Sequence, residues 1–320
     1  MRQAIRESIR RAAEALSTAD EVALACHVSP DGDALGSLLG LAHAAAGVGK
    51  RVVASFGSPF AVGAQYEFLD LGPLVPPERF PAAPGLMVVL DVASPDRLGE
   101  LAAPAARAGR LVVFDHHPTN PGFGHIRVVE PGAAATAELV YHLLRQLGWP
   151  IDHRVATALL TGLVSDTGGF QYSSTSPSVL RLAARLVEAG ARPEEVGQHL
   201  YEWLPFGYLQ VSGAVLGRAR LEGGLLWSVL YLADYRGTGV GPEDLDLLID
   251  GLRTAREAEV TVLVKEIGEG WKVSLRSRGA VDVGAIAAAH GGGGLHNAAG
   301  FNAGGDPEAI IAAIRGRLRA

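Results

Sequence analysis

The sequence has little of three features that would each assign a chain to a particular class of protein. It contains a single cysteine, Cys26, which excludes a disulfide framework within the chain and indicates a reducing, cytoplasmic compartment. It has no apolar run long enough to cross a bilayer, because a serine and a histidine interrupt the mildly apolar stretch 34–49. Its first residues carry charges throughout, as in an amphipathic helix and unlike a signal peptide. We therefore expect no membrane partner.

The chain also lacks an excess of basic residues. Its 28 lysines and arginines are outnumbered by 34 aspartates and glutamates, and its net charge is −6. A protein that binds long nucleic acids usually presents a basic face, since lysine and arginine must replace the counterions of the phosphates. Anionic substrates should therefore be short, with metal ions supplying much of the neutralising charge. Hydrophobic residues, by contrast, fill 48% of the 320 positions, which is enough for two domains with large cores.

The first part of the chain, residues 1–190, alternates between helical and strand-like segments. Strands separated by helices are typical of βαβ units, so we expect an α/β domain with a mostly parallel sheet flanked by helices. A serine and a proline before the last helix, and a glycine after it, are typical start and stop signals. The expected helices are 2–17, 34–47, 136–147, 154–163 and 178–189, and the expected strands are 22–25, 51–56, 86–90 and 111–114.

The rest of the chain is expected to form a connector and a smaller domain. Residues 191–221 are predicted to be a helical connector, and we interpret its aromatic side chains, from Tyr201 to Tyr208, as packing between the domains. Residues 222–320 are predicted to form a smaller α/β domain. Its expected strands are 225–232, 258–266 and 271–276, with a turn at 268–270, and its expected helices are 242–252, 283–290 and 307–318.

Aspartate and histidine residues follow several apolar segments of the N-terminal part. Most of them come at or just after a predicted strand, where an open parallel sheet binds its ligands, and one follows a predicted helix. Each feature is weak alone, because Pro-Asp-Gly turns are common and an aspartate often caps a helix. Together, however, five carboxylates would meet at one sheet edge, where they would repel one another unless divalent cations neutralised them. They are Asp31, Asp33, Asp91, Asp115 and Asp166, accompanied by His27, His116 and His117.

These residues, in this order, resemble the motifs of the DHH phosphoesterase superfamily. The first motif is His-Val-Ser-Pro-Asp-Gly-Asp at 27–33, and the second is Asp91. The namesake Asp-His-His stands at 115–117, and the fourth motif is Asp166 within the sequence SDTGGF. The late segment HGGGGLHNAAG, at 290–300, resembles the glycine-rich motif of the associated C-terminal domain, called DHHA1. The resemblance covers nearly the whole chain.

The resemblance implies a centre with two divalent metal ions, typically manganese. Asp115 would orient a histidine without binding metal, and His117 would face the substrate phosphate. Imidazole and carboxylate ligands without thiolate suit manganese, and two close metals can activate a water and stabilise both the attacking and the leaving oxygen. By analogy, one ion takes His27, Asp31 and Asp91, and the other takes Asp33, Asp91, His116 and Asp166, with Asp91 bridging the two.

The C-terminal domain is expected to hold the substrate. Arg276, at the end of a predicted strand, is our candidate for pairing with a terminal phosphate, and Arg278 competes for that role. In the family a histidine usually follows the glycines directly, whereas this chain has Leu295 there and a histidine one place later. A flexible turn and an exposed arginine on an edge strand remain the alternatives. The candidate phosphate donors are the backbone amides of Gly292, Gly293 and Gly294, which would form an anion-binding nest, and the side chains of His296 and Asn297.

The activity that the resemblance implies is hydrolysis of short single-stranded oligoribonucleotides to mononucleotides, with release of the 3′-phosphate from pAp. A cleft between the domains that bound both ends of a substrate would select substrates by their length. The alternatives are a phosphodiesterase acting on cyclic or linear dinucleotides and, in a different class, a non-catalytic nucleotide- or RNA-binding protein. The lysine-rich segment of the pyrophosphatase relatives is not found. The sequence leaves the oligomeric state open, with a homodimer among the alternatives.

Overall fold

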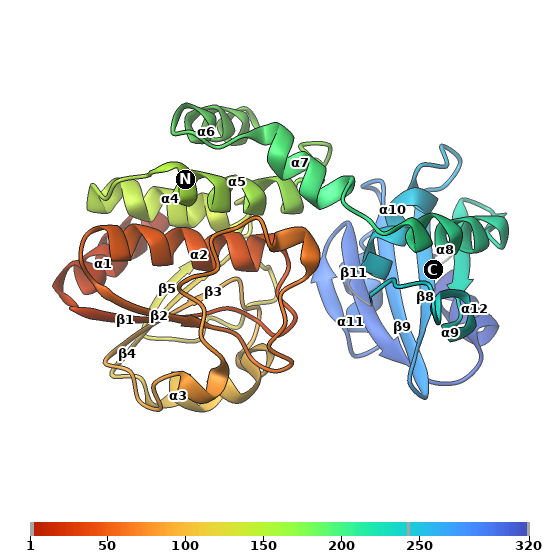
Figure 1. Ribbon diagram of the computed structural model, residues 1–320. Helices are drawn as coiled ribbons and strands as arrows, with labels where there is room; N and C mark the ends of the chain where they lie inside the picture. The colour runs from red at the N-terminus through yellow and green to blue at the C-terminus, as the bar shows by residue number, and fades with distance from the viewer. Residues whose placement is uncertain (1–2, 242–243, 319–320) are drawn as a thin grey trace. The chain divides into compact units, whose positions relative to one another are not determined.

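Each of two units of the chain is built around its own β-sheet. A computed structural model describes residues 3–241 and 244–318, and the chain divides into the units Met1–Trp203 and Leu204–Ala320 (Figure 1). The N-terminal unit contains every residue that the sequence assigns to the metal cluster, and the C-terminal unit contains the proposed phosphate donors. Among the described residues, no helix combines the length and the apolar character needed to span a bilayer.

The sheet of the N-terminal unit is entirely parallel in the described chain. Its strand order is β2-β1-β3-β4-β5, so the chain crosses over between β2 and β3. The three central strands are almost completely buried, as expected for a sheet that helices cover on both faces. Their carboxyl ends lie at one edge of the sheet. The strands are β1 (Glu21–Ala25), β2 (Arg51–Ser55), β3 (Leu86–Leu90), β4 (Arg110–Asp115) and β5 (Ile126–Val129).

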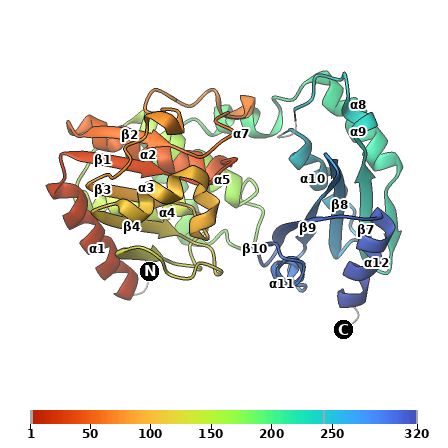
Figure 2. The same ribbon diagram turned by 90° about the horizontal axis from the view of Figure 1, so that it is seen from below.

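Helices cover the two faces of this sheet unequally. Four long helices lie on one face, whereas a short helix and the 3-10 helix Pro95–Leu101 lie on the other (Figures 1 and 2). Two further helices pack outside the first layer, against α5. The first face has α1 (Gln3–Thr18), α2 (Gly32–Gly47), α4 (Thr136–Leu147) and α5 (His153–Asp166), the second has α3 (Ala102–Arg107), and the outer helices are α6 (Pro177–Glu188) and α7 (Pro193–Tyr201).

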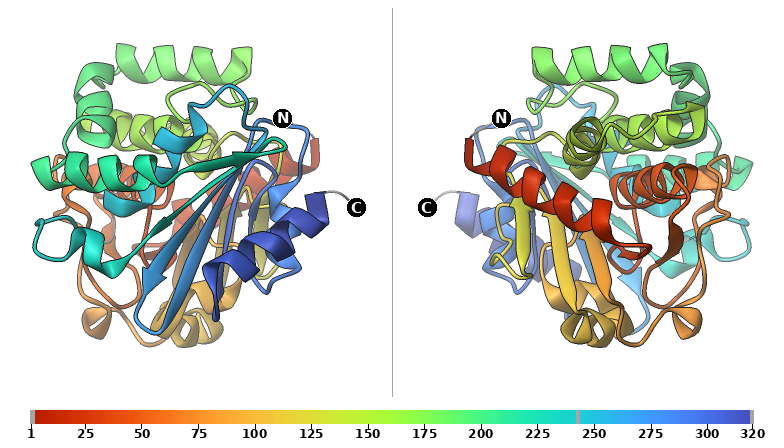
Figure 3. Two further views of the ribbon diagram at one scale, coloured as in Figure 1. Left: turned by 90° about the vertical axis from the view of Figure 1, so that its right-hand side faces the viewer. Right: turned by 90° about the vertical axis from the view of Figure 1, so that its left-hand side faces the viewer.

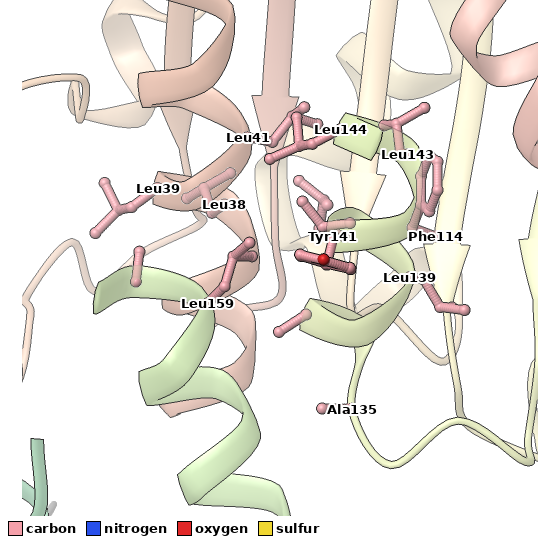
Figure 4. Packing of buried hydrophobic residues seen from close by; sticks show 14 of the residues in the cluster. Leu38, Leu39, Leu41, Phe114, Ala135, Leu139, Tyr141, Leu143, Leu144 and Leu159 are labelled. Carbon is pink, nitrogen blue, oxygen red and sulfur yellow. The ribbon is translucent and has the colours of Figure 1, made fainter. Parts of the chain in front are cut away.

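The core of the N-terminal unit lies between its sheet and the four long helices. Figure 4 shows Leu143 of α4 beside Phe114 of β4, and Leu38 of α2 on the side of α5 that carries Leu159. These side chains are fully buried, and removing their apolar surface from water contributes about 2 kcal/mol each to stability. Helix α4 illustrates the pattern, because its apolar residues recur every three or four positions and it ends at Gly148 in a left-handed conformation.

Helices α2 and α5 approach each other through glycines, and this contact places two ligand candidates. A Cβ atom on Gly36 would lie 2.3 Å from the carbonyl oxygen of Ala158, so no other residue fits there without moving a backbone. A Cβ atom on Gly162 would lie 2.7 Å from Oδ1 of Asp33. The close packing therefore brings the first turn of α2, with Asp33, beside the last turn of α5, which ends at Asp166.

The C-terminal unit has a mixed sheet with the strand order β10-β11-β9-β8-β7-β6. Strands β7 and β8 are parallel, and the other pairs are antiparallel. Helices α8 (Phe206–Gly217) and α10 (Leu248–Arg253) pack on one face, and α11 (Val283–Ala288) and α12 (Pro307–Leu318) pack on the other (Figure 3). The strands are β6 (Arg220–Glu222), β7 (Leu225–Leu230), β8 (Val260–Ile267), β9 (Gly270–Ser277), β10 (Gly293–Leu295) and β11 (Ala298–Ala303), and a short helix α9 (Leu232–Tyr235) follows β7.

The elements expected from the sequence are largely confirmed, and the omissions have a physical cause. Strands β5, β6, β10 and β11 were not predicted, because they are short or rich in glycine and alanine and gain their pairing from neighbouring strands. The expected helix 242–252 begins at two residues outside the described chain. Its described remainder forms the 3-10 helix Asp244–Leu247 followed by α10.

Candidate metal centre

The carboxyl ends of three central strands carry the first residues of the site. Asp91 directly follows β3, Asp115 ends β4, and His27 lies two positions beyond β1. All three are at least nine-tenths buried. Asp91 has a φ of 58°, a left-handed conformation that aspartate adopts more readily than most residues. Such local strain persists where surrounding contacts hold it, and it often marks a functional position.

One group of possible ligand atoms lies around His27. Its Nε2 is 3.6 Å from Oδ2 of Asp91 and 3.8 Å from Oδ1 of Asp31, and one atom from each residue lies within 4.8 Å of the other two. The opposite nitrogen, Nδ1, donates to the carbonyl oxygen of Val28 at 2.9 Å, which leaves Nε2 facing the carboxylates. Asp31 also caps α2, because its Oδ1 accepts from the backbone N–H groups of Asp33 and Ala34.

A second group lies around His116. Its Nε2 is 3.0 Å from Oδ2 of Asp166, 3.7 Å from Oδ1 of Asp91 and 3.9 Å from Oδ2 of Asp33. The two oxygens of Asp91 thus face the two histidines, one on each side. This is the arrangement that a bridging carboxylate requires. In the described part of the chain, the buried Nε2 of His116 makes no hydrogen bond.

His117 belongs to a different contact. Its Nδ1 donates to Oδ1 of the fully buried Asp115 at 2.7 Å. The other oxygen of Asp115 accepts from Nδ2 of Asn120 at 2.6 Å, and the same Nδ2 donates to the carbonyl oxygen of Val92 at 3.1 Å. Both carboxylate oxygens of Asp115 are therefore engaged by side chains of its own loop. The His117 ring is held through one nitrogen, which leaves Nε2 for a ligand outside the chain.

Thr136 and Asn120 were not predicted from the sequence, although both hold the carboxylates in place. Thr136 begins α4, and its Oγ1 donates to Oδ1 of Asp91 at 3.0 Å. Its backbone N–H donates to Oδ2 of Asp33 at 2.6 Å, and the N–H of Ala137 donates to Oδ1 at 2.9 Å. The N-terminus of α4 thus binds the Asp33 carboxylate as it would an anion. A threonine at the start of a predicted helix was the only signal in the sequence.

The electrostatics of the cluster are those of a site built for cations. Burial raises the pKa of Asp33 well above its usual range, and the charges of Asp91 and Asp166 add to this effect. Burial also raises the pKa of Asp166. Burial lowers the pKa of His27, but its contacts with Asp91 and Asp31 outweigh this and raise that pKa to about 9. Without a metal ion, the cluster would therefore hold protons in the places where cations are expected.

The residues present fit divalent metal ions. All ion pairs of the five carboxylates in the described chain are with histidines, and none is with a lysine or arginine. Neutral imidazole and carboxylate oxygen, without thiolate, is a donor set for divalent first-row metals. The buried Nε2 of His116, with three carboxylates within 4 Å and no hydrogen bond, is the atom that such an ion would satisfy.

The proposed phosphate donors of the C-terminal unit lie together at one end of its sheet. Gly293 to Leu295 form the edge strand β10, and His296 and Asn297 form the two-residue turn into β11. Arg276 of β9 pairs in register with Ala298, next to this turn. The glycines are needed by the hairpin itself, since a Cβ atom on Gly292 would lie 2.2 Å from the carbonyl oxygen of Gly300.

The displaced histidine of this segment contacts the loop between β9 and α11. Nε2 of His296 is 2.9 Å from the carbonyl oxygen of Gly279, and Nδ1 is 3.5 Å from Asp282. Leu295, in the position where the family has a histidine, pairs directly with Ala298. Directly opposed residues on neighbouring strands share a face, so Leu295, Ala298 and Arg276 lie on the same face of the sheet. The shift of one residue thus places an apolar side chain on the face that carries the arginine, with Ala298 of β11 between the two.

Comparison with known proteins assigns a family domain to each part of the chain. Residues 21–163 match the DHH family, N-terminal domain, and residues 226–319 match the DHHA1 domain. The chain is 37% identical to the bifunctional oligoribonuclease and PAP phosphatase NrnA of Thermus thermophilus, over 92% of this chain and 88% of that protein.

Solved structures share the fold. The crystal structure of an exopolyphosphatase-related protein from Bacteroides fragilis is similar with a TM-score of 0.89 and 25% identity, covering 98% of this chain and 96% of that one. RecJ from Thermus thermophilus is similar with a TM-score of 0.57 and 17% identity, covering 98% of this chain and 54% of that one. The chain therefore belongs to the DHH family, with a DHH N-terminal domain followed by a DHHA1 domain.

Proposed function

We propose that this protein is a metal-dependent phosphoesterase that hydrolyses short oligoribonucleotides to mononucleotides and releases the 3′-phosphate from pAp. The observation that carries the proposal is the buried cluster of carboxylates and imidazoles with no lysine or arginine to neutralise it in the described chain. The substrate class is supported by the identity of 37% to the Thermus NrnA over nearly the whole length of both chains.

The proposed cofactor is a pair of divalent ions, with manganese as the metal that suits these ligands. Bound there, the ions would polarise the phosphate ester and supply an activated water as nucleophile. Burial raises the pKa of the Cys26 thiol, so a thiolate nucleophile is not available beside them. The first ion would be held by His27, Asp31 and Asp91, and the second by Asp33, Asp91, His116 and Asp166.

The chain's own groups would position the substrate around these ions. His117 is fixed by Asp115, and its Nε2 is proposed to donate to a phosphate oxygen. Burial lowers the pKa of His117, but the hydrogen bond to Asp115 and the charge of Asp91 raise it overall, which favours the donating form. Asn120 holds Asp115 by its other oxygen and so keeps the pair in one orientation.

The C-terminal unit is proposed to bind the rest of the substrate. Arg276 supplies the positive charge, and the hairpin of Gly292, Gly293, Gly294, His296 and Asn297 supplies backbone and side-chain donors. Short substrates are in keeping with the net charge of −6, which does not suit long nucleic acids. We further propose a cytoplasmic location, which the single cysteine supports, and leave a homodimer as an open alternative.

A substrate panel in manganese tests the proposal. The panel contains pAp, RNA and DNA from dimers to long single strands, and a cyclic dinucleotide. We expect the fastest turnover on RNA of two to four nucleotides and release of phosphate from pAp. Preferred hydrolysis of the cyclic dinucleotide would instead assign a dinucleotide phosphodiesterase. Equal rates on dimers and long strands would refute the selection by length, and binding without turnover of any substrate would refute the enzyme.

A further inference from the structure

Arg97 stands beside the metal centre and has no assigned role. It lies in the 3-10 helix Pro95–Leu101, which follows β3 and Asp91 along the chain. Its side chain is exposed, and its Nη2 lies 3.5 Å from Nδ1 of His27. Because that Nδ1 faces the carbonyl oxygen of Val28 at 2.9 Å, the guanidinium approaches the ring without being satisfied by it.

The backbone around Arg97 is held firmly against the His27 loop. The carbonyl oxygen of Arg97 accepts from the N–H of Val28 at 2.9 Å. Two glycines close over the same valine, since a Cβ atom on Gly57 or Gly99 would lie 2.7 or 2.9 Å from its side chain. The backbone from which the guanidinium extends is therefore held in a fixed position beside the His27 loop.

The guanidinium of Arg97 has no ion-pair partner within the described chain, although its charge contributes to the lowered pKa of the neighbouring Asp96. Some exposed arginines are paired, such as Arg51 with Glu21 and Arg192 with Glu195. Arg97 makes no ion pair with any described residue, although the carboxylates of the metal centre lie on the other side of His27. It is thus a guanidinium one imidazole ring away from the proposed ions, with its donors facing solvent.

We propose that Arg97 binds the phosphodiester adjacent to the one that is cleaved. His27 directs Nε2 towards the proposed ions and Nδ1 towards Arg97. The imidazole ring therefore separates the arginine from the ions, which is too far for a contact with the scissile phosphate but suits a contact with the neighbouring phosphate. A guanidinium matches two phosphate oxygens at once and keeps its charge at all working pH values. This role rests on the proposed function, and it would make the N-terminal unit itself recognise more than one phosphate.

The test pairs two variants with two substrates. The substrates are a trinucleotide and the same trinucleotide with an uncharged methylphosphonate at the linkage adjacent to the cleaved one. Arg97→Ala should raise KM for the charged trinucleotide about tenfold with little change in kcat, because a charged hydrogen-bonded contact is lost. Arg97→Lys should restore part of the affinity. Wild type should lose a similar factor on the methylphosphonate, whereas Arg97→Ala should lose almost nothing further.

Arg110→Ala is the matched control. Arg110 is an exposed arginine at the first residue of β4, at the opposite end of the strands from the site. The Arg110→Ala substitution should leave the KM for both trinucleotides unchanged. Manganese binding measured by calorimetry should be the same in all variants. If Arg97→Ala weakens both substrates equally or leaves KM unchanged, the phosphate contact is refuted while the proposed function stands. If wild type hydrolyses neither substrate, the proposed function itself has failed.

Discussion

Two carboxylate clusters of the protein, one in each unit, have opposite kinds of partner. In the C-terminal unit, Asp246 is 2.7 Å from the ammonium groups of both Lys265 and Lys272. In the N-terminal unit, the fully buried Asp33 and the nearly buried Asp91 face only histidines and hydrogen-bond donors. The chain's own lysines neutralise Asp246, whereas Asp33 and Asp91 require a cation that the described residues do not supply.

This difference separates a structural charge cluster from a functional one. A carboxylate beside lysines has a lowered pKa and needs no further partner, as Asp246 shows. A group of carboxylates with raised pKa values, such as Asp33 and Asp166, costs folding energy until cations or protons arrive. We therefore attribute the N-terminal cluster to metal binding because no lysine or arginine in the described part of the chain balances its negative charges. The number of its acidic residues alone would not justify this.

The largest effect should follow from removing the bridging carboxylate. Asp91→Asn keeps the shape and the hydrogen bond from Thr136 but loses the negative charge between the two histidines. We expect kcat on a diribonucleotide to fall by about a thousandfold or more, because the substitution weakens both proposed ions at once. Steady-state rates in manganese measure this. Unchanged turnover would show that the unbalanced cluster is not a catalytic metal centre.

Metal removal should affect the units differently. Manganese at about a hundred times its dissociation constant should stabilise the N-terminal unit by about 3 kcal/mol, or several degrees in Tm. The C-terminal unit, with its carboxylate already neutralised by two lysines, should show no such shift. Hydrogen exchange of the whole chain, measured once with manganese and once with a chelator, would report the stabilisation of each unit separately. Equal protection of both units, or of neither, would contradict the contrast drawn between them.

Thr136 provides a test of intermediate size within the N-terminal unit. Thr136→Val removes the hydroxyl that holds Asp91 but keeps the backbone donor to Asp33 and a similar shape. We expect manganese affinity to weaken about tenfold, as is usual when a partner of a metal ligand is lost. Thr136→Ser should restore most of it. Calorimetric titration measures the affinity, and an effect on stability alone, with unchanged affinity, would reduce Thr136 to a helix-packing role.

The ligand candidates could be found from the sequence because their positions follow from simple rules. Parallel strands end at a common edge, so polar residues after apolar runs, such as Asp91 and Asp115, converge whatever the loops do. Asp166 was found for a related reason, since it follows an apolar helical run; the structure adds that glycines bring this helix close to α2. In each case one strong local pattern determines where the side chain lies.

The supporting residues could not be found in this way. Thr136 and Asn120 act through distances set by the tertiary fold, and neither a threonine at a helix start nor an asparagine in a loop is distinctive. The glycine segment was expected as a loop, yet Gly293 and Gly294 pair with β11 as an edge strand. Its pairing comes from a neighbouring strand, and glycine has no strand preference of its own to reveal it.

The smallest effect should come from the balanced cluster of the C-terminal unit. Asp246→Asn removes a carboxylate that contacts Lys272 and the buried Lys265, and because Asp246 is itself half-exposed we expect a loss of about 1–2 kcal/mol at neutral pH. Burial tends to raise the pKa of Asp246, but the two lysines lower it overall. Its stabilising contribution is therefore complete above pH 5 and is lost as the pH falls through the lowered pKa. The free energies of unfolding of wild type and Asp246→Asn, measured with denaturant, should differ by a constant amount at neutral pH and converge as the pH falls below the lowered pKa of Asp246, whereas activity in manganese should be unchanged. A gap that widens in acid would show that the lysines do not balance this charge.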